Sequence, residues 1–132
     1  MPRPTEFILI RHGQSLWNAD GRWQGHGDPP LSEQGRCQVA DLSRALSSQG
    51  IQRVISSDLL RALETASILA EVWNLDPSRD SRFRELDVGI WTGLTREEIE
   101  EREGEALRRF DRGEPDLLAG GGESRRQLRL RV

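Results

Sequence analysis

The sequence predicts an α/β domain, a three-layer sandwich of helices packed on a mainly parallel sheet. Two observations support this class. Short apolar runs alternate along the chain with segments whose apolar residues recur at helical spacing, which is the strand–helix–strand order of a parallel sheet. The chain has 132 residues, the length of one domain, and no apolar run approaches the ~20 residues that a membrane helix needs.

The first predicted element is a buried strand over residues 6–11, a short apolar run that ends in polar residues. Residues 12–31 follow as a long loop rich in Gly, Asn, Asp, Pro and Trp. Loops of this length in compact domains are usually functional. Ser32 then suits the N-cap of a helix, and Gly50 suits the position just past its end.

A second strand is expected over residues 52–56. Ser57 or Asp58 can cap a second helix that runs to about Trp73, since apolar residues recur there along one stripe. Residues 81–83 are expected to form a short third strand.

The last part of the chain differs in composition. Gly89 and Gly93 frame another loop, and Thr95 with Glu98 three residues later forms a capping box that starts a third helix. The final 36 residues, 97–132, hold 18 charged residues and only 10 from the apolar set. Such a segment cannot build its own core. We therefore expect a single domain over 1–132, in which 97–132 docks loosely on the rest or is mobile.

Composition excludes several functions. The net charge is −3, so the chain is neither a strongly basic nucleic-acid binder nor attracted to a membrane surface. All 19 basic residues are arginine, which excludes chemistry at a lysine. Cys37 is the single cysteine, so no internal disulfide can form and a cytoplasmic location is expected.

The residues that can carry chemistry follow the first predicted strand. Arg11 and His12 lie where the carboxyl end of a parallel strand collects ligands, and Gly13 lets the backbone turn there and approach a ligand. Arg61, one turn into the second predicted helix, can reach the same edge. Two guanidinium groups beside an imidazole suit a dianionic phosphate.

The chemistry that these residues favour is phosphoryl transfer. A neutral imidazole at His12 can attack phosphorus while the arginines spread the charge. The leaving oxygen then needs a proton, and Glu85 is the best placed carboxylic acid to supply it.

Four blocks in order resemble one known family, the histidine phosphatase superfamily, which includes the phosphoglycerate mutases. The first block is Leu9-Ile10-Arg11-His12-Gly13-Gln14-Ser15 with Asn18, Arg22-Trp23-Gln24-Gly25, Asp28 and Pro30-Leu31-Ser32 with Gly35. The others are Ser56-Ser57-Asp58-Leu59-Leu60-Arg61-Ala62 with Glu64-Thr65-Ala66, Arg84-Glu85-Leu86 with Gly89-Ile90-Trp91-Thr92-Gly93-Leu94-Thr95, and Gly121-Gly122-Glu123-Ser124.

The resemblance implies a phosphoglycerate mutase-like fold and a phosphohistidine on His12. It also implies that Arg11, Arg61 and Asn18 hold the phosphoryl group and that Glu85 is the acid and base. Gln24 and Gly25 would line the substrate side. No metal and no other cofactor is implied.

Two departures from the family pattern alter the expectation. Thr92 stands where the family usually has glutamate, which should matter little. The family's second catalytic histidine, downstream of the block that ends at Ser124, has no counterpart, because the only histidines are His12 and His26. We therefore expect a domain that is incomplete at its C-terminus, binds phosphate and turns over slowly or not at all. Two chains are expected to pair as a homodimer through the exposed sheet region.

Alternatives remain open at this point. The preferred prediction is a phosphatase that acts on a small phosphomonoester. The alternatives are a phosphoglycerate mutase and a non-catalytic phosphate-binding module. His26 is expected near the substrate entrance. The tryptophans near the motifs can wall the pocket or pack in the core. The arginines after Ser124 are expected on a solvated terminal helix.

Overall fold

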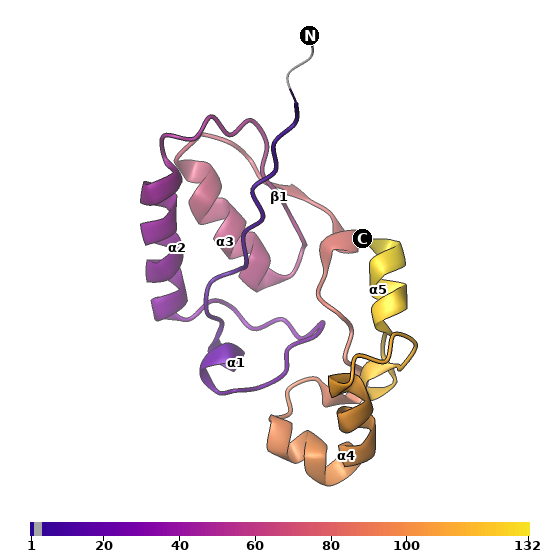
Figure 1. Cartoon of the computed structure of the whole chain (residues 1–132). Coiled ribbons are helices and arrows are strands. Elements are labelled where there is room, and N and C mark those ends of the chain that lie inside the picture. Colours follow the sequence, from indigo (N-terminus) through magenta and orange to yellow (C-terminus); the bar gives the residue numbers. More distant parts are fainter. Residues whose placement is uncertain (2–3) are drawn as a thin grey trace.

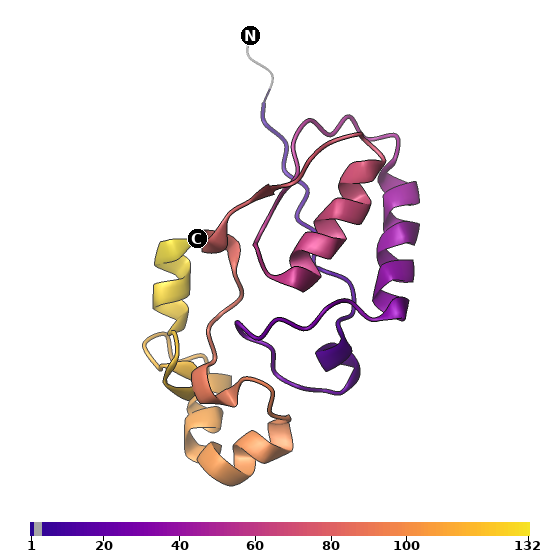
Figure 2. The ribbon, with the colours of Figure 1, turned by 180° about the vertical axis from the view of Figure 1, so that it is seen from behind.

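The computed structural model describes residues 1 and 4–132. Helices α2 and α3 lie side by side, and α4 and α5 lie at the other end of the molecule (Figure 1). Figure 2 gives the same arrangement from behind. The helices are α1 (Leu16–Ala19), α2 (Glu33–Leu46), α3 (Leu60–Glu71), α4 (Arg96–Asp111) and α5 (Arg125–Arg131). The strands are β1 (Ile55–Ser56) and β2 (Ser78–Arg79), and the 3₁₀ turns are η1 (Ser81–Phe83), η2 (Gly89–Trp91) and η3 (Ala119–Gly121).

The sheet is small and parallel. Ile55 lies opposite Ser78 and Ser56 opposite Arg79, and α3 connects the two strands. This strand–helix–strand unit confirms the predicted α/β class and the parallel pairing. The ladder is shorter than the predicted strand over 52–56, because only Ile55 and Ser56 of that range belong to it.

The predicted buried strand over 6–11 is wrong in this structure. Within the described residues the sheet has the order β1-β2 and gives the segment no ladder to join. Its apolar side chains therefore meet solvent, and Phe7 and Leu9 are 79% and 93% exposed. A run that is apolar on both faces is buried only where neighbouring strands and covering helices exist.

Two local predictions are also corrected. Residues 81–83 form the 3₁₀ turn η1 instead of a strand, because the Asp80 side chain accepts a hydrogen bond from the Arg82 amide at 2.9 Å and turns the chain. Neither Ser57 nor Asp58 is the N-cap of α3, which begins after Leu59 without a side-chain cap. Instead, Asp28 of the long loop accepts a hydrogen bond from the Leu60 amide at 2.6 Å.

The predicted helix after Ser32 is confirmed at its start. The Ser32 hydroxyl accepts a hydrogen bond from the Gly35 amide at 3.0 Å and caps α2. The helix ends at Leu46, earlier than the predicted end next to Gly50. Leu31, Val39 and Leu69 are buried where α2 packs on α3. The first half of the chain thus forms a two-helix layer that anchors both ends of the long loop.

The second half has a core of its own. Thr95 and Glu98 form the predicted capping box at the start of α4. Leu107 and Ala119, from the charged C-terminal segment, are fully buried against Trp91 and its neighbours. Trp23 meets Trp91 edge to face at 5.5 Å between ring centroids. Both tryptophans pack in or against this core.

A close backbone contact joins the two ends of this core. Gly120 and Gly122 pass directly against residues 87–89. A Cβ at Gly89 would lie 2.1 Å from the Gly120 carbonyl oxygen, and one at Gly122 would lie 2.4 Å from the Asp87 carbonyl oxygen. Only residues without a side chain allow this approach.

Of the helices formed by residues 1 and 4–132, none has the length and apolar character needed to cross a membrane.

Candidate active site

The imidazole of His12 is held in one tautomer. Its Nδ1 lies 2.7 Å from the carbonyl oxygen of Gly13, and since a carbonyl can only accept, Nδ1 must carry the hydrogen. Nε2 is then the nitrogen with the free lone pair. His12 is half-buried at the start of the long loop, directly before α1.

The surroundings keep this imidazole neutral. Burial is the largest cause that lowers the pKa of His12 below its ordinary value of 6.5. The positive charges of Arg61 and Arg11 lower it further, while the hydrogen bond to Gly13 and the negative charge of Glu85 raise it. Arg11, Arg61 and Glu85 are the charged side chains that act on the imidazole, and the four residues are called here the His12 cluster (Arg11, His12, Arg61 and Glu85).

Arg61 is a buried cation with an unusual set of partners. Its side chain, in the first turn of α3, is only 2% exposed. Nη1 donates to the carbonyl of Gly27 at 2.8 Å and Nη2 donates to the carbonyl of Gly25 at 2.9 Å. Burial lowers the pKa of Arg61, and the more distant charges of Glu85 and Asp28 raise it.

The described residues supply Arg61 with no carboxylate at ion-pair distance. Burying a charge without a counter-ion is costly. The two carbonyls use two of the five guanidinium N–H groups, so others are left for a ligand. Arg11 is exposed, and within residues 1 and 4–132 no hydrogen bond engages its side chain. An anion beside His12 would satisfy both arginines.

Thr65 of α3 binds the turn at His12 and Gly13, called here the His12 turn. Its hydroxyl accepts a hydrogen bond from the Gly13 amide at 3.1 Å and donates one to the Arg61 carbonyl at 2.8 Å. Gly13 also lies against α2, since a Cβ there would come 2.7 Å from the Gly35 carbonyl oxygen. The absence of a side chain at Gly13 thus lets the loop touch α2, and the approach of its backbone to a ligand stays a prediction.

The predicted substrate residues lie around Ser15. The Asn18 side-chain oxygen accepts from the Ser15 amide at 3.0 Å, within the capping box of α1. The Gln24 side-chain oxygen accepts from the Ser15 hydroxyl. Gly25, with a φ of +48°, presents its carbonyl to Arg61. Within the described chain, the side-chain NH₂ groups of Asn18 and Gln24 donate no hydrogen bond.

Glu85 lies in an irregular segment between η1 and η2, called here the Glu85 loop (residues 84–88). Its carboxylate accepts a hydrogen bond from the Leu86 amide at 2.8 Å. Its backbone carbonyl accepts one from Nε2 of His26 at 2.8 Å. His26 is thus a contact of the Glu85 loop. Arg84 next to Glu85 forms a bidentate pair with Asp58, at 2.6 and 2.5 Å.

Comparison with known proteins identifies the lineage of this arrangement. The family model for the histidine phosphatase superfamily (branch 1) matches residues 7–132. The chain belongs to the histidine phosphatase superfamily. A relative from Salmonella paratyphi B, named probable phosphoglycerate mutase GpmB, is 40% identical over 127 residues, which are 96% of this chain and 59% of that protein.

Solved structures of histidine phosphatases share the fold. A mycobacterial glucosyl-3-phosphoglycerate phosphatase, solved in complex with VO3, matches with a TM-score of 0.85 and 36% identity over 92% of this chain and 57% of its own. Bacillus stearothermophilus YhfR matches with a TM-score of 0.84 and 34% identity over 92% and 60%. The expected phosphoglycerate mutase-like fold is confirmed, and the chain spans less than two thirds of the length of these relatives.

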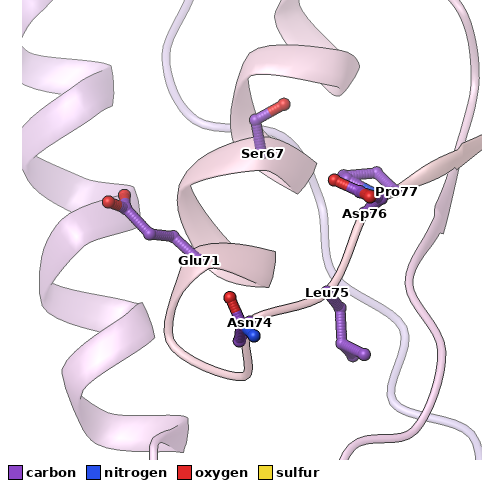
Figure 3. Close-up of a pocket in the computed structure, with 6 residues that line it drawn as sticks. All are labelled: Ser67, Glu71, Asn74, Leu75, Asp76 and Pro77. Atoms are coloured by element: carbon purple, nitrogen blue, oxygen red, sulfur yellow. The ribbon is translucent and has the colours of Figure 1, made fainter.

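A hollow in the surface lies away from the His12 cluster. It is lined by Ser67, Glu71, Asn74, Leu75, Asp76 and Pro77 (Figure 3). This hollow is at the carboxyl end of α3, whereas Arg61 is at its amino end. Two carboxylates line it, so it does not suit a phosphate. Residues 1 and 4–132 hold no group of three side chains placed to bind a metal ion.

Sequence reasoning missed the contacts that three residues make around the candidate site. Thr65 was noticed only as part of a motif, and the loop contact that gives it a role has a separation of 52 residues. Asp28 replaces the expected cap of α3. Arg131 was expected on a solvated helix, yet its Nη2 donates to the Glu85 carbonyl at 3.0 Å.

Proposed function

We propose that the domain transfers the phosphoryl group of a phosphomonoester to His12 and then to water. The observation that carries this proposal is the pairing of a neutral imidazole, whose Nε2 lone pair is free, with a buried Arg61 that lacks a counter-ion. The first group is a nucleophile and the second stabilises the charge that moves through the reaction.

In the first step the Nε2 lone pair of His12 attacks phosphorus, and the bond to the ester oxygen breaks. The leaving oxygen takes the proton of Glu85 in its acid form. Arg61 and Arg11 hold the phosphoryl oxygens, with the side-chain amide of Asn18 as a further donor. Gln24 and Gly25 border the substrate side.

In the second step water attacks the phosphohistidine. The Glu85 carboxylate takes a proton from that water, the P–N bond breaks and orthophosphate leaves. His12 regains its lone pair, and Glu85 returns to its acid form. No metal ion or other cofactor takes part in these steps.

The names of the structural relatives favour a phosphatase over a mutase. The structural neighbour with a TM-score of 0.85 is a phosphatase, solved with VO3 and also with inorganic phosphate. The substrate proposed here is accordingly a small phosphomonoester. A second candidate is phosphoglycerate mutase, favoured by the name of the relative that is 40% identical. A mutase would pass the phosphoryl group to phosphoglycerate instead of water.

Mass spectrometry of the acid-labile adduct tests the proposal. The chain is mixed with excess phosphomonoester, quenched in base and searched for a phosphoryl group on His12. The expected result is one such group, absent from His12→Gln and present in His26→Gln. Added phosphoglycerate separates water from a mutase acceptor. Binding of orthophosphate with no adduct under any condition would reduce the chain to a phosphate-binding module.

The association of two chains through the exposed apolar segment is part of the same proposal. Within residues 1 and 4–132, Phe7 and Leu9 belong to no strand ladder, and their apolar side chains are exposed. Light scattering on dilute protein should give twice the mass of one chain. A dilute, folded monomer would contradict this association while leaving the chemistry at His12 intact.

A further inference from the structure

The Glu85 loop has no helix or strand to hold residues 84–88 in place. Glu85 nevertheless has to stay at a fixed distance from the His12 imidazole if it is to protonate a leaving oxygen. Its fixed position must come from side chains that grip the backbone of the loop.

Arg131, on the last turn of α5, makes the most hydrogen bonds to the backbone of this region. Its Nη1 donates to the carbonyl of Arg82 at 2.7 Å and to the carbonyl of Arg84 at 2.8 Å. Its Nη2 donates to the carbonyl of Glu85 at 3.0 Å. One guanidinium therefore binds three carbonyl oxygens within four consecutive residues, a set that a planar fork of five donors can serve.

Glu123 holds Arg131 in this position. Its two carboxylate oxygens accept from Nε and Nη2 of Arg131, both at 2.7 Å. The Glu123 backbone amide donates to the Asp87 carbonyl at 2.8 Å, so this carboxylate is fixed to the far end of the same loop. The two side chains are only 24% and 15% exposed, which favours a persistent pair.

Other contacts leave Glu85 little freedom. His26 donates to the same carbonyl that Arg131 binds, and Arg84 is paired with Asp58. If Arg131 served only to stabilise the fold through an ion pair, the carboxylate of Glu123 would be a sufficient partner for it. The three additional carbonyl contacts are what tie Arg131 to the position of Glu85.

We infer that Arg131, oriented by Glu123, is a positioning residue that sets the place of Glu85 relative to His12. This inference rests on the proposed role of Glu85 as the acid. Loss of Arg131 should then slow the steps that need a proton and spare those that do not.

The test compares Arg131→Ala with Arg126→Ala, which removes an exposed arginine of the same helix together with its pair to Asp116. Phosphohistidine formation is timed in single turnover with glycerol phosphate, whose alkoxide needs a proton, and with 2,4-dinitrophenyl phosphate, whose phenolate does not. Arg131→Ala should slow the first by on the order of 10- to 100-fold and the second by no more than about twofold. Arg126→Ala should change neither.

Two outcomes with these substrates would overturn the inference: equal slowing of both, which indicates a fold or phosphate-binding defect, or no slowing of either. Glu85→Gln separates this failure from that of the proposed function. If Glu85→Gln gives no difference between the substrates, Glu85 is not the acid and the proposed mechanism fails by itself.

Amide hydrogen exchange decides the positioning even if the parent chain transfers nothing to His12. Arg131→Ala should speed exchange at amides 86–89 more than Arg126→Ala does, while α2 and α3 keep their protection. Unchanged exchange at those amides would show that Arg131 does not hold the loop.

Discussion

Arginines serve opposite purposes in two neighbouring regions of this domain. In the His12 cluster, Arg61 is buried with carbonyl partners and no carboxylate at ion-pair distance within the described residues. Around the Glu85 loop, Arg84 is paired with Asp58 and Arg131 with Glu123. In the mechanism proposed above, the first region keeps positive charge for a ligand, and the second uses it to hold the backbone.

Arg61→Met should have the largest effect on phosphate binding. The change removes the buried charge at similar side-chain volume, so the dissociation constant for orthophosphate should rise on the order of 100-fold. Titration calorimetry measures it, and the rise in Tm produced by phosphate should disappear.

Arg84→Met is the matched control. That guanidinium is already neutralised by Asp58, so phosphate affinity should stay within about twofold. Equal losses of affinity in the two variants would abolish the contrast between the regions.

Gly13→Ala should have the next largest effect, this time on stability. The new methyl would meet the Gly35 carbonyl at 2.7 Å and a Val39 methyl at 2.8 Å. Overpacking of this kind costs about 1–3 kcal/mol of unfolding free energy. Urea denaturation measures it, with Gly50→Ala as the control because nothing lies within 4 Å of a Cβ there. Similar midpoints for the two variants would mean that the His12 turn yields easily.

Thr65→Val should cost about 1–2 kcal/mol, since it leaves the buried Gly13 amide without an acceptor at nearly constant shape. Because this bond fixes the turn after His12, phosphate affinity should fall as well. Thr65→Ser keeps the hydroxyl and should restore most of both. If the valine variant were as stable as the parent and the serine variant less stable, the methyl group of Thr65 and not its hydrogen bonds would hold the turn.

Asp58→Asn should have the smallest effect, about 0.5 kcal/mol after allowance for solvent screening of a partly exposed pair. Hydrogen bonds from Arg84 are the largest cause that lowers the pKa of Asp58 below 3.8. The unfolded chain therefore takes up the proton first as pH falls, so the stabilisation is complete above about pH 5 and is lost through the folded-state value.

Denaturation of Asp58→Asn and the parent chain at pH 7 and in strong acid checks this sign. A difference that persisted unchanged in acid would mean that packing, and not charge, stabilises the pair.

Elements fixed by local chemistry could be predicted from the sequence. Ser32 caps α2 and Thr95 caps α4 because each bond closes within three residues. The segment over 6–11 was mispredicted for the opposite reason. Its apolar pattern indicates that the side chains favour burial. Burial itself depends on neighbouring strands, and the described part of the chain places none beside this segment.

The candidate site divides in the same way. Arg11 and His12 are adjacent in sequence, and Arg61 could be placed near them because the amino end of a helix that follows a parallel strand faces the same edge. The hydrogen bond from Arg131 to the Glu85 carbonyl joins residues that are 46 positions apart in the sequence, and it depends on the path of a turn rich in glycine. Neither hydrophobic periodicity nor composition predicts a contact between residues so far apart in the sequence.

The contact of Gly120 and Gly122 with residues 87–89 has a consequence for how this sequence can change. Two stretches of backbone touch there with no side chain between them, so even one added carbon at Gly89 or Gly122 would force them apart. Such a separation would also carry α5 away from Glu85. Natural variants should therefore keep these glycines together or lose them together, and a single replacement should be among the rarest neutral changes in the chain.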